Sequence, residues 1–215
     1  MNIRKFSFKM LLAGVLSVAI LGGSFAPAAY AKSVPKKGKT TQSAAMPAAM
    51  RKALRMSNSQ WEDKLGDLDL CVGDLVFTDS KKISSDTLFT FFSYITQSSE
   101  YPKNYINRWY SKKDKKYHVP VSDILKVLNK YFNGANFNPA KIYGYNKETK
   151  KIDCIVDGFG GGRFPKLSGK TIVSNNTLRI TIKYYDEFYK KVEFTKGYTI
   201  RYSNTGYKYL SIIEK

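Results

Sequence analysis

The sequence is short of the residues that most metal and redox centres require. Its 215 residues include one histidine, His118, and two cysteines, Cys71 and Cys154. Zinc sites take three or four ligands from histidine, cysteine and carboxylate side chains, and iron–sulfur clusters need several cysteine thiolates. We therefore expect neither a metal site nor a cofactor.

Acidic residues are also scarce. There are 17 Asp and Glu residues against 36 Lys and Arg residues, which gives the chain a formal net charge of +19. A hydrophobic content of 43%, with 13 phenylalanines and 16 tyrosines, can fill a packed core and excludes a chain that is disordered throughout. A strongly basic folded protein is expected to attract anionic partners.

Catalytic motifs are missing as well. There is no nucleophile elbow and only one imidazole base, so a nucleophilic triad is not supported. The glycine-rich segment Asp157–Arg163 resembles a phosphate loop, but a strand-like sequence follows it instead of a helix, and it lacks the Lys-Ser/Thr pair of a P-loop. We interpret this segment as a loop or bulge between strands.

Residues 1–31 have the pattern of a secretory signal peptide. Basic residues come first, the uncharged stretch Met10–Leu21 follows, and small residues lead up to Ala31. Cleavage is expected between Ala31 and Lys32. An uncleaved anchor is the alternative, but the apolar stretch is short and glycines and a proline follow it. The prediction is a secreted, extracytoplasmic protein that associates with the cell envelope.

Residues 32–60 form a basic arm that contains no acid. Its seven cations are Lys32, Lys36, Lys37, Lys39, Arg51, Lys52 and Arg55. The first half is typical of a flexible linker, whereas Met46, Met50 and Leu54 recur every four residues and predict a short amphipathic helix. Two roles are open for this helix: it binds an anionic membrane or wall polymer, or it packs on the domain or remains a solvated tail.

Residues 61–215 are predicted to form one α+β domain. A serine can cap each of two helices, at residues 84–95 and 122–131. Aromatic residues four apart at 101–109 share one helical face, which we interpret as core rather than as a sugar-stacking surface. From residue 142 onward the period of the apolar residues changes to two, and turn residues separate the segments. We expect N-terminal helices packed on a curved antiparallel β-meander sheet.

Part of this domain resembles a known family. The run Tyr117–Gly134, a tyrosine-rich hairpin, Asp157–Gly162 and the final segment Gly206–Ile212 are similar to the secreted cystatin-like, nuclear-transport-factor-2-like domains of Gram-positive bacteria. The resemblance covers about residues 117–213. It implies a cone-shaped sheet wrapped around helices to leave a pocket, in a superfamily of isomerases, dehydratases and non-catalytic binding modules. No catalytic residue is carried over from it.

Strand alternation assigns two surfaces to the meander. One face points toward the helices and carries phenols, which predict either a polar-lined pocket or tyrosine packing; the pocket candidates are Tyr184, Tyr198, Tyr202 and Tyr209. The opposite face is basic, and its candidate anion-binding residues are Arg179, Lys183, Lys191 and Arg201. That face is either a binding surface or an ordinary solvated sheet face.

The two cysteines bracket the predicted helices. In an exported protein a disulfide between Cys71 and Cys154 would tie the sheet to the helical layer and stabilise it by roughly 4 kcal/mol. Two buried free thiols are the alternative. We expect the disulfide.

The functional prediction is a non-catalytic binding module. Its expected partners are an anionic cell-wall polymer or membrane surface and a small molecule in the concave pocket, and no nucleic acid. A third possibility is an inhibitor or partner-recognition domain, which would bind a protein through the sheet rim or loops. The alternative is a small-molecule enzyme of the same fold, of the isomerase or hydrolase type. That alternative needs a carboxylate or histidine in a closed pocket, and the candidates by position are His118, Asp153, Asp157 and Glu193.

Overall fold

The computed structural model describes residues 45–155, 164–186, 188 and 190–215. These residues belong to one compact unit that spans Ser43–Lys215. The predicted leader with its cleavage point at Ala31 and Lys32, the first part of the arm and the glycine-rich segment 157–163 lie outside the described residues. No helix in the described ranges is long and apolar enough to cross a membrane.

Two helices near the start of the described residues come before the long sheet in the sequence. Helix α1 (Ala48–Leu54) forms where the methionine spacing predicted it, and its Met50 is buried in the core. Helix α2 (Asn58–Cys71) begins with a capping box, because Ser57 accepts from the backbone of Gln60 and the Gln60 side chain accepts from the backbone of Ser57. The segment that follows residue 60 had given no clear pattern from the sequence, and the structure makes it helical.

The central helices follow their sequence signals with one change. Helix α3 (Ser85–Gln97) is capped by Ser84, whose hydroxyl accepts from the Thr87 backbone at 3.0 Å. Helix α4 (Val121–Tyr131) begins directly after Pro120 and has no side-chain cap, so the predicted cap at Ser122 is wrong. Three short 3-10 helices, η1 (Ser80–Lys82), η2 (Tyr105–Trp109) and η3 (Pro139–Lys141), complete the helical part.

Four short strands form the first sheet. They are β1 (Tyr110–Ser111), β2 (Lys116–Pro120), β3 (Tyr145–Asn146) and β4 (Lys151–Cys154). All pairs are antiparallel and the order is β1-β2-β4-β3. The first predicted hairpin therefore pairs with β2 and stays separate from the meander.

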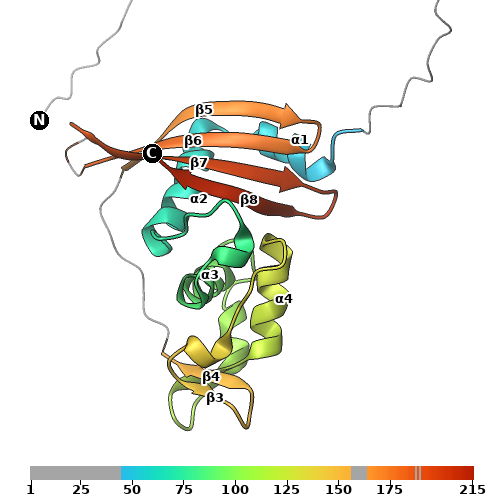
Figure 1. The fold of residues 1–215 in the computed structure, drawn as a ribbon, viewed down its shortest axis with the longest axis vertical. Helices are drawn as coiled ribbons and strands as arrows, with labels where there is room; N and C mark the ends of the chain where they lie inside the picture. Colours follow the sequence, from blue (N-terminus) through green and yellow to red (C-terminus); the bar gives the residue numbers. More distant parts are fainter. Residues whose placement is uncertain (1–44, 156–163, 187, 189) are drawn as a thin grey trace, which may run out of the picture. The chain divides into compact units, whose positions relative to one another are not determined.

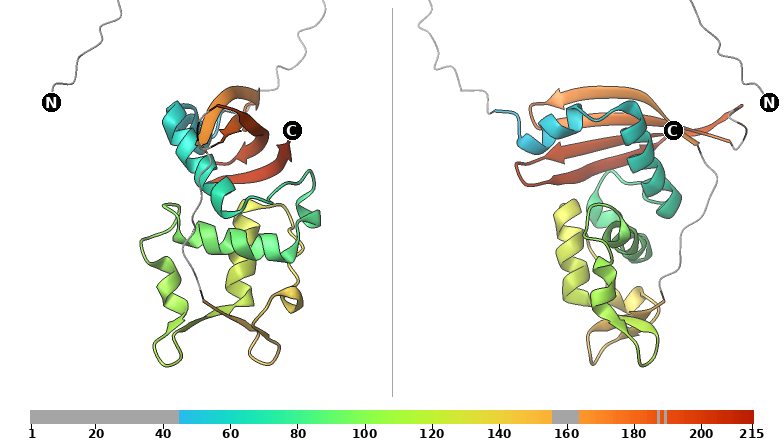
Figure 2. Two further views of the ribbon diagram at one scale, coloured as in Figure 1. Left: turned by 90° about the vertical axis from the view of Figure 1, so that its left-hand side faces the viewer. Right: turned by 180° about the vertical axis from the view of Figure 1, so that it is seen from behind.

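Four long strands form the second sheet (Figure 1). They are β5 (Phe164–Ser174), β6 (Thr177–Tyr185), β7 (Val192–Tyr202) and β8 (Tyr207–Glu214), each paired antiparallel with the next. Helices α1 and α2 lie on one face of this sheet, and no helix in the described ranges lies on the other (Figure 2). The fold is α+β, and the meander has one covered and one open face, as alternation predicted.

Both edges of the β5–β8 sheet are partly covered. On β5, the backbone N–H of Leu167 donates to the Glu62 carboxylate of α2 at 2.9 Å. Helix α2 comes this close because Gly66 has no side chain, and a Cβ there would lie 2.5 Å from the ring of Pro165. On the β8 edge, Phe77 and Ile212 exchange two backbone hydrogen bonds of 2.7 and 2.9 Å.

Candidate functional site

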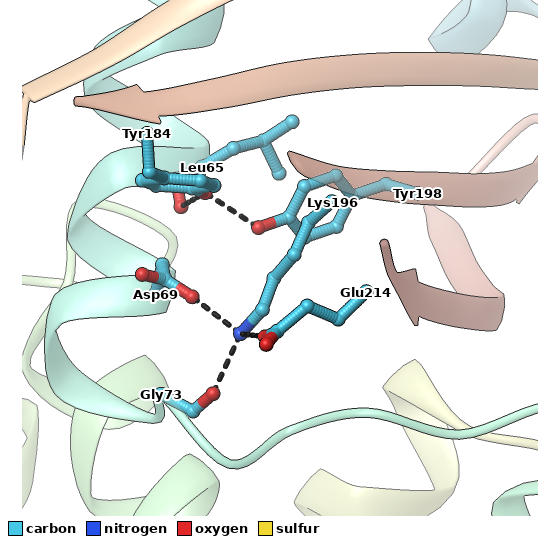
Figure 3. A network of polar contacts seen from close by, with 7 residues as sticks. All are labelled: Leu65, Asp69, Gly73, Tyr184, Lys196, Tyr198 and Glu214. Atoms are coloured by element: carbon cyan, nitrogen blue, oxygen red, sulfur yellow. Dashed lines mark hydrogen bonds and ion pairs between the residues drawn. The ribbon is translucent and has the colours of Figure 1, made fainter. Parts of the chain in front are cut away.

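The four tyrosines predicted to line a pocket are buried on the covered face. Tyr184 donates its hydroxyl hydrogen to the Leu65 carbonyl of α2 at 3.0 Å. Because that hydrogen is used, Tyr198 is the donor in the 2.6 Å bond between the two phenols (Figure 3). Tyr184 also stacks on Phe194, with 4.7 Å between the ring centroids. The structure brings Tyr184 and Tyr198 together as packed, hydrogen-bonded core, while Tyr202 and Tyr209 lie further along the same face.

Beside these phenols lies a buried ion cluster that sequence reasoning missed. The Lys196 ammonium donates to Asp69 Oδ1 at 2.5 Å and to the Gly73 carbonyl at 2.6 Å, and Glu214 Oε2 lies 3.5 Å away (Figure 3). The Lys196 and Asp69 side chains are 2% and 0% exposed. We name Lys196, Asp69, Glu214 and Gly73 the inner charge cluster. It ties α2 to β7 and β8.

The signal for this cluster was present in the alternation of β7. Lys196 lies two residues from both Phe194 and Tyr198, so it shares their inward face if β7 is one continuous strand. A charged residue at an inward position has to be paired, because an isolated buried charge is strongly unfavourable. The partner, 127 positions away in sequence, could not be identified from the pattern.

Three hollows are lined by Tyr207 of β8, and one of them is also lined by Arg201 of the open face. One hollow, with a volume of about 800 Å³, lies between α2, α3 and β8 and is lined by Tyr209 among others. Two neighbours, of about 420 and 450 Å³, are also lined by Tyr207 and include Tyr202. Two of the predicted pocket tyrosines therefore contribute to cavity walls.

The Glu100 carboxylate lines both hollows next to α2. Glu100 pairs with Lys64 and accepts from the Tyr207 hydroxyl at 3.0 Å, while the Lys64 ammonium lies 4.4 Å from the centre of the Tyr207 ring. Burial, the largest single influence, favours the neutral acid, but the Lys64 charge and the hydrogen bonds from Lys64 and Tyr207 outweigh it. The pKa of Glu100 is therefore lowered. Glu100 is held as a charged, fully paired carboxylate, which makes it a weak proton acceptor.

All four predicted anion-binding residues are exposed. Arg179, Lys183 and Arg201 lie on the open face of the meander, whereas Lys191 precedes β7, beyond the register shift in which Tyr185 pairs with Val192. We call Arg179, Lys183, Lys191 and Arg201 the outer cationic face. None of the four forms a salt bridge with an acid in the part of the chain that the structure describes. Threonines stand beside two of them across the ladder, Thr199 opposite Arg179 and Thr195 opposite Lys183.

The four cations follow the strand direction. Arg201 is level with Thr177 of β6, Arg179 and Lys183 lie on β6 itself, and the Lys191 carbonyl accepts from the backbone of Asp186. With a rise of about 3.3 Å per residue, the row is roughly 30 Å long. A row of this length matches an extended chain of anions better than a single small ion.

The acid and histidine candidates for catalysis are separated from the cavities. His118 Nδ1 lies 2.6 Å from Asp153 Oδ1, and its Nε2 lies 2.9 Å from Asp114 Oδ2. The hydrogen bond to Asp153, reinforced by both carboxylate charges, raises the pKa of His118. Glu193 is exposed on the open face of the meander, and Asp157 lies outside the described residues. His118 lines none of the hollows around Tyr207.

The predicted disulfide is wrong. Cys71 ends α2 and Cys154 ends β4, and both are free thiols. The physical reason is the separate first sheet, which keeps the hairpin that carries Cys154 away from the face on which α2 packs. Burial raises the pKa of each thiol to about 11, so neither is an activated nucleophile.

No cluster of three or more potential metal ligands occurs among the described residues. Comparison with family models, with curated proteins and with solved structures gives no match to this chain. The argument for function therefore rests on the surfaces described above.

Proposed function

We propose that this protein is a secreted, non-catalytic binding module that holds an extended anionic polymer of the cell envelope. The observation that carries the proposal is the outer cationic face, a row of exposed cations that have no partner acid among the described residues, along the sheet whose other face is covered by α1 and α2. Arginine and lysine recognise phosphate and carboxylate groups, and neighbouring threonine hydroxyls add hydrogen bonds. A phosphodiester polymer of the cell wall has this chemistry.

We further propose that the β5–β8 meander with α2 is a cystatin-like arrangement. A helix that precedes four sequential antiparallel strands and packs on their inner face supports this assignment. In this arrangement the inner face supplies the core and the outer face is free for binding. The signal-peptide pattern of residues 1–31 supports export to the compartment in which wall polymers occur.

The test is binding of poly(glycerol phosphate) to a chain starting at Ser43, which contains the compact unit without the preceding basic residues. The R179E/K183E variant should bind at least about tenfold more weakly, because two attractive contacts become repulsive. Affinity should also fall steeply with added salt. The matched control is K81E/K126E, which makes the same charge change at exposed lysines on η1 and α4.

Equal losses in the two variants would contradict the proposal, since general charge rather than this face would then be responsible. Glu193 sharpens the test because it is an acid on the same face. The E193Q variant should bind the polymer more tightly than the unchanged chain. A salt-independent affinity would also overturn the proposal.

An enzyme of the isomerase or hydrolase type is the second candidate, and Glu100 is the observation that favours it. It is a carboxylate in the wall of the hollow of about 800 Å³, together with Lys64 and Tyr207. Its lowered pKa is unfavourable for a general acid or base at neutral pH. Two results together would exclude this enzyme. The Glu100→Gln variant would bind the polymer as well as the wild-type chain does, and the wild-type chain would show no turnover of small sugar phosphates or esters.

A further inference from the structure

The first sheet carries a second concentration of positive charge. Its two hairpin turns, at residues 112–116 and 147–151, hold seven exposed lysines: Lys112, Lys113, Lys115, Lys116, Lys147, Lys150 and Lys151. We call these two segments the lysine turns. Because Tyr117 pairs with Cys154 and Pro120 pairs with Lys151, the two turns lie at opposite ends of the β2–β4 ladder, and both tips point toward the same end of the molecule (Figures 1 and 2). None of the seven side chains pairs with an acid within the described ranges.

The few acids near the lysine turns are largely engaged. Asp114 and Asp153 both contact the single imidazole of His118, at 2.9 and 2.6 Å. Glu148 is the remaining carboxylate on these segments. The local field at the two tips is therefore positive, and it adds to the net charge of the whole chain.

The backbone of each turn is strained at one lysine. Lys115 and Lys150 have φ angles of 57° and 53°, the left-handed region in which glycine is relaxed and a lysine side chain is strained. The second turn is also firmly built, since Asn146 Oδ1 accepts from the backbones of Glu148 and Thr149 at 3.0 Å each. A strained residue held in a well-defined turn is a pointer to function.

The arrangement of the lysine turns indicates which kind of anionic partner they fit. The charges sit on two separate tips at opposite ends of a short ladder, so they do not converge on one small ion. Two separate tips that point toward the same end of the molecule match a broad, uniformly anionic surface, on which both tips can meet headgroups. We infer that the lysine turns dock this protein onto the anionic headgroups of a lipid bilayer, a partner distinct from the polymer proposed for the outer cationic face.

The test is sedimentation of the chain starting at Ser43 with vesicles of equal parts phosphatidylglycerol and phosphatidylcholine, against vesicles of phosphatidylcholine alone. The K113E/K150E variant should lose at least about tenfold in partition to the anionic vesicles. Variants R179E/K183E and K81E/K126E should stay within about twofold of the unchanged chain. Binding of poly(glycerol phosphate) should be weakened by R179E/K183E and left nearly unchanged by K113E/K150E. The two proposals can therefore be rejected independently.

A second variant separates charge from folding. K115G/K150G removes two charges and relieves two strained backbones, so it should unfold at the same or a higher temperature and still partition several-fold less to anionic vesicles. The inference is overturned if all three charge-reversal variants lose partition equally, if R179E/K183E alone loses it, or if neutral vesicles bind as well as anionic ones.

Discussion

The inner charge cluster of the β5–β8 sheet and the ion cluster around His118 on the first sheet differ in their access to water. In the inner charge cluster, the Lys196 and Asp69 side chains are 2% and 0% exposed. Around His118 the corresponding fractions are 28% for the histidine, 35% for Asp153 and 43% for Asp114. Water can replace a lost partner in the second cluster but not in the first, so the same kind of contact has a different energetic role in each.

The largest expected effect comes from breaking the inner charge cluster. Lys196→Met leaves Asp69 without its cation in a dry site, and we expect a loss of about 3–5 kcal/mol in the free energy of unfolding. Urea denaturation followed by circular dichroism measures it. The double variant K196M/D69L should recover much of that loss, because the only carboxylate left without Lys196 is then Glu214, whose side chain is 45% exposed and can be solvated. A double variant as unstable as K196M would contradict this account.

Removal of one phenol oxygen should have an intermediate effect. Tyr184→Phe abolishes the bond to Leu65 and leaves the Tyr198 hydroxyl without its acceptor, at a cost of about 1–2 kcal/mol. Tyr198→Phe removes only the shared bond and should cost less. The order of the two denaturation midpoints is the readout, and Tyr185→Phe, next to Tyr184 but on the opposite face of β6, serves as the control.

The exposed cluster around His118 should make the stability of the fold depend on pH. Because the folded-state pKa of His118 is raised above 6.5, its contribution is complete below that pH and is lost as the pH rises through the higher folded value. Asp114 has a lowered pKa, so its part is present above 3.8 and is lost as the pH falls through the lower value. His118→Gln should flatten the stability profile between neutral and mildly acid pH, by at most about 1 kcal/mol.

The cysteines should have the smallest effect. Cys71 ends α2 and Cys154 ends β4, so the two thiols lie on elements that belong to different sheets or their cover. Thiol titration of the unreduced protein in denaturant should count two free sulfhydryls. Without denaturant both should react slowly near neutral pH because their pKa values are raised to about 11. A count of zero would reinstate the disulfide.

Local signals in the sequence predicted the elements better than their assembly. The serine cap and aromatic face of α3 and the alternation of β6 depend on neighbouring residues, and the structure confirms both. The separation of the β3–β4 hairpin into another sheet depends on pairing between Val119 and Ile152, which no local pattern encodes. The disulfide failed for the same reason, since it required a layer arrangement that strand periodicity does not specify.

The candidate binding residues also divide into those that local sequence signals predict and those that depend on the assembled fold. The exposure of Arg179 and Lys183 follows from alternation, because a polar residue between two inward apolar ones has to face solvent. Lys196 was missed because lysine followed by glycine at 196–197 is read as a break between strands, whereas β7 runs through it. The lysine turns are visible as composition, but the common direction of their tips depends on the twist of the paired strands.

The cover on the two edges of the β5–β8 sheet bears on solubility. An open edge offers unpaired N–H and C=O groups to another chain and can seed fibres, especially in a sheet rich in tyrosine and isoleucine. Here Glu62 of α2 occupies part of one edge and Phe77 part of the other. Gly66 is the small residue that lets α2 reach its edge, so a methyl group added at that position would meet the ring of Pro165, push α2 away from β5 and leave that edge open to pairing with another chain.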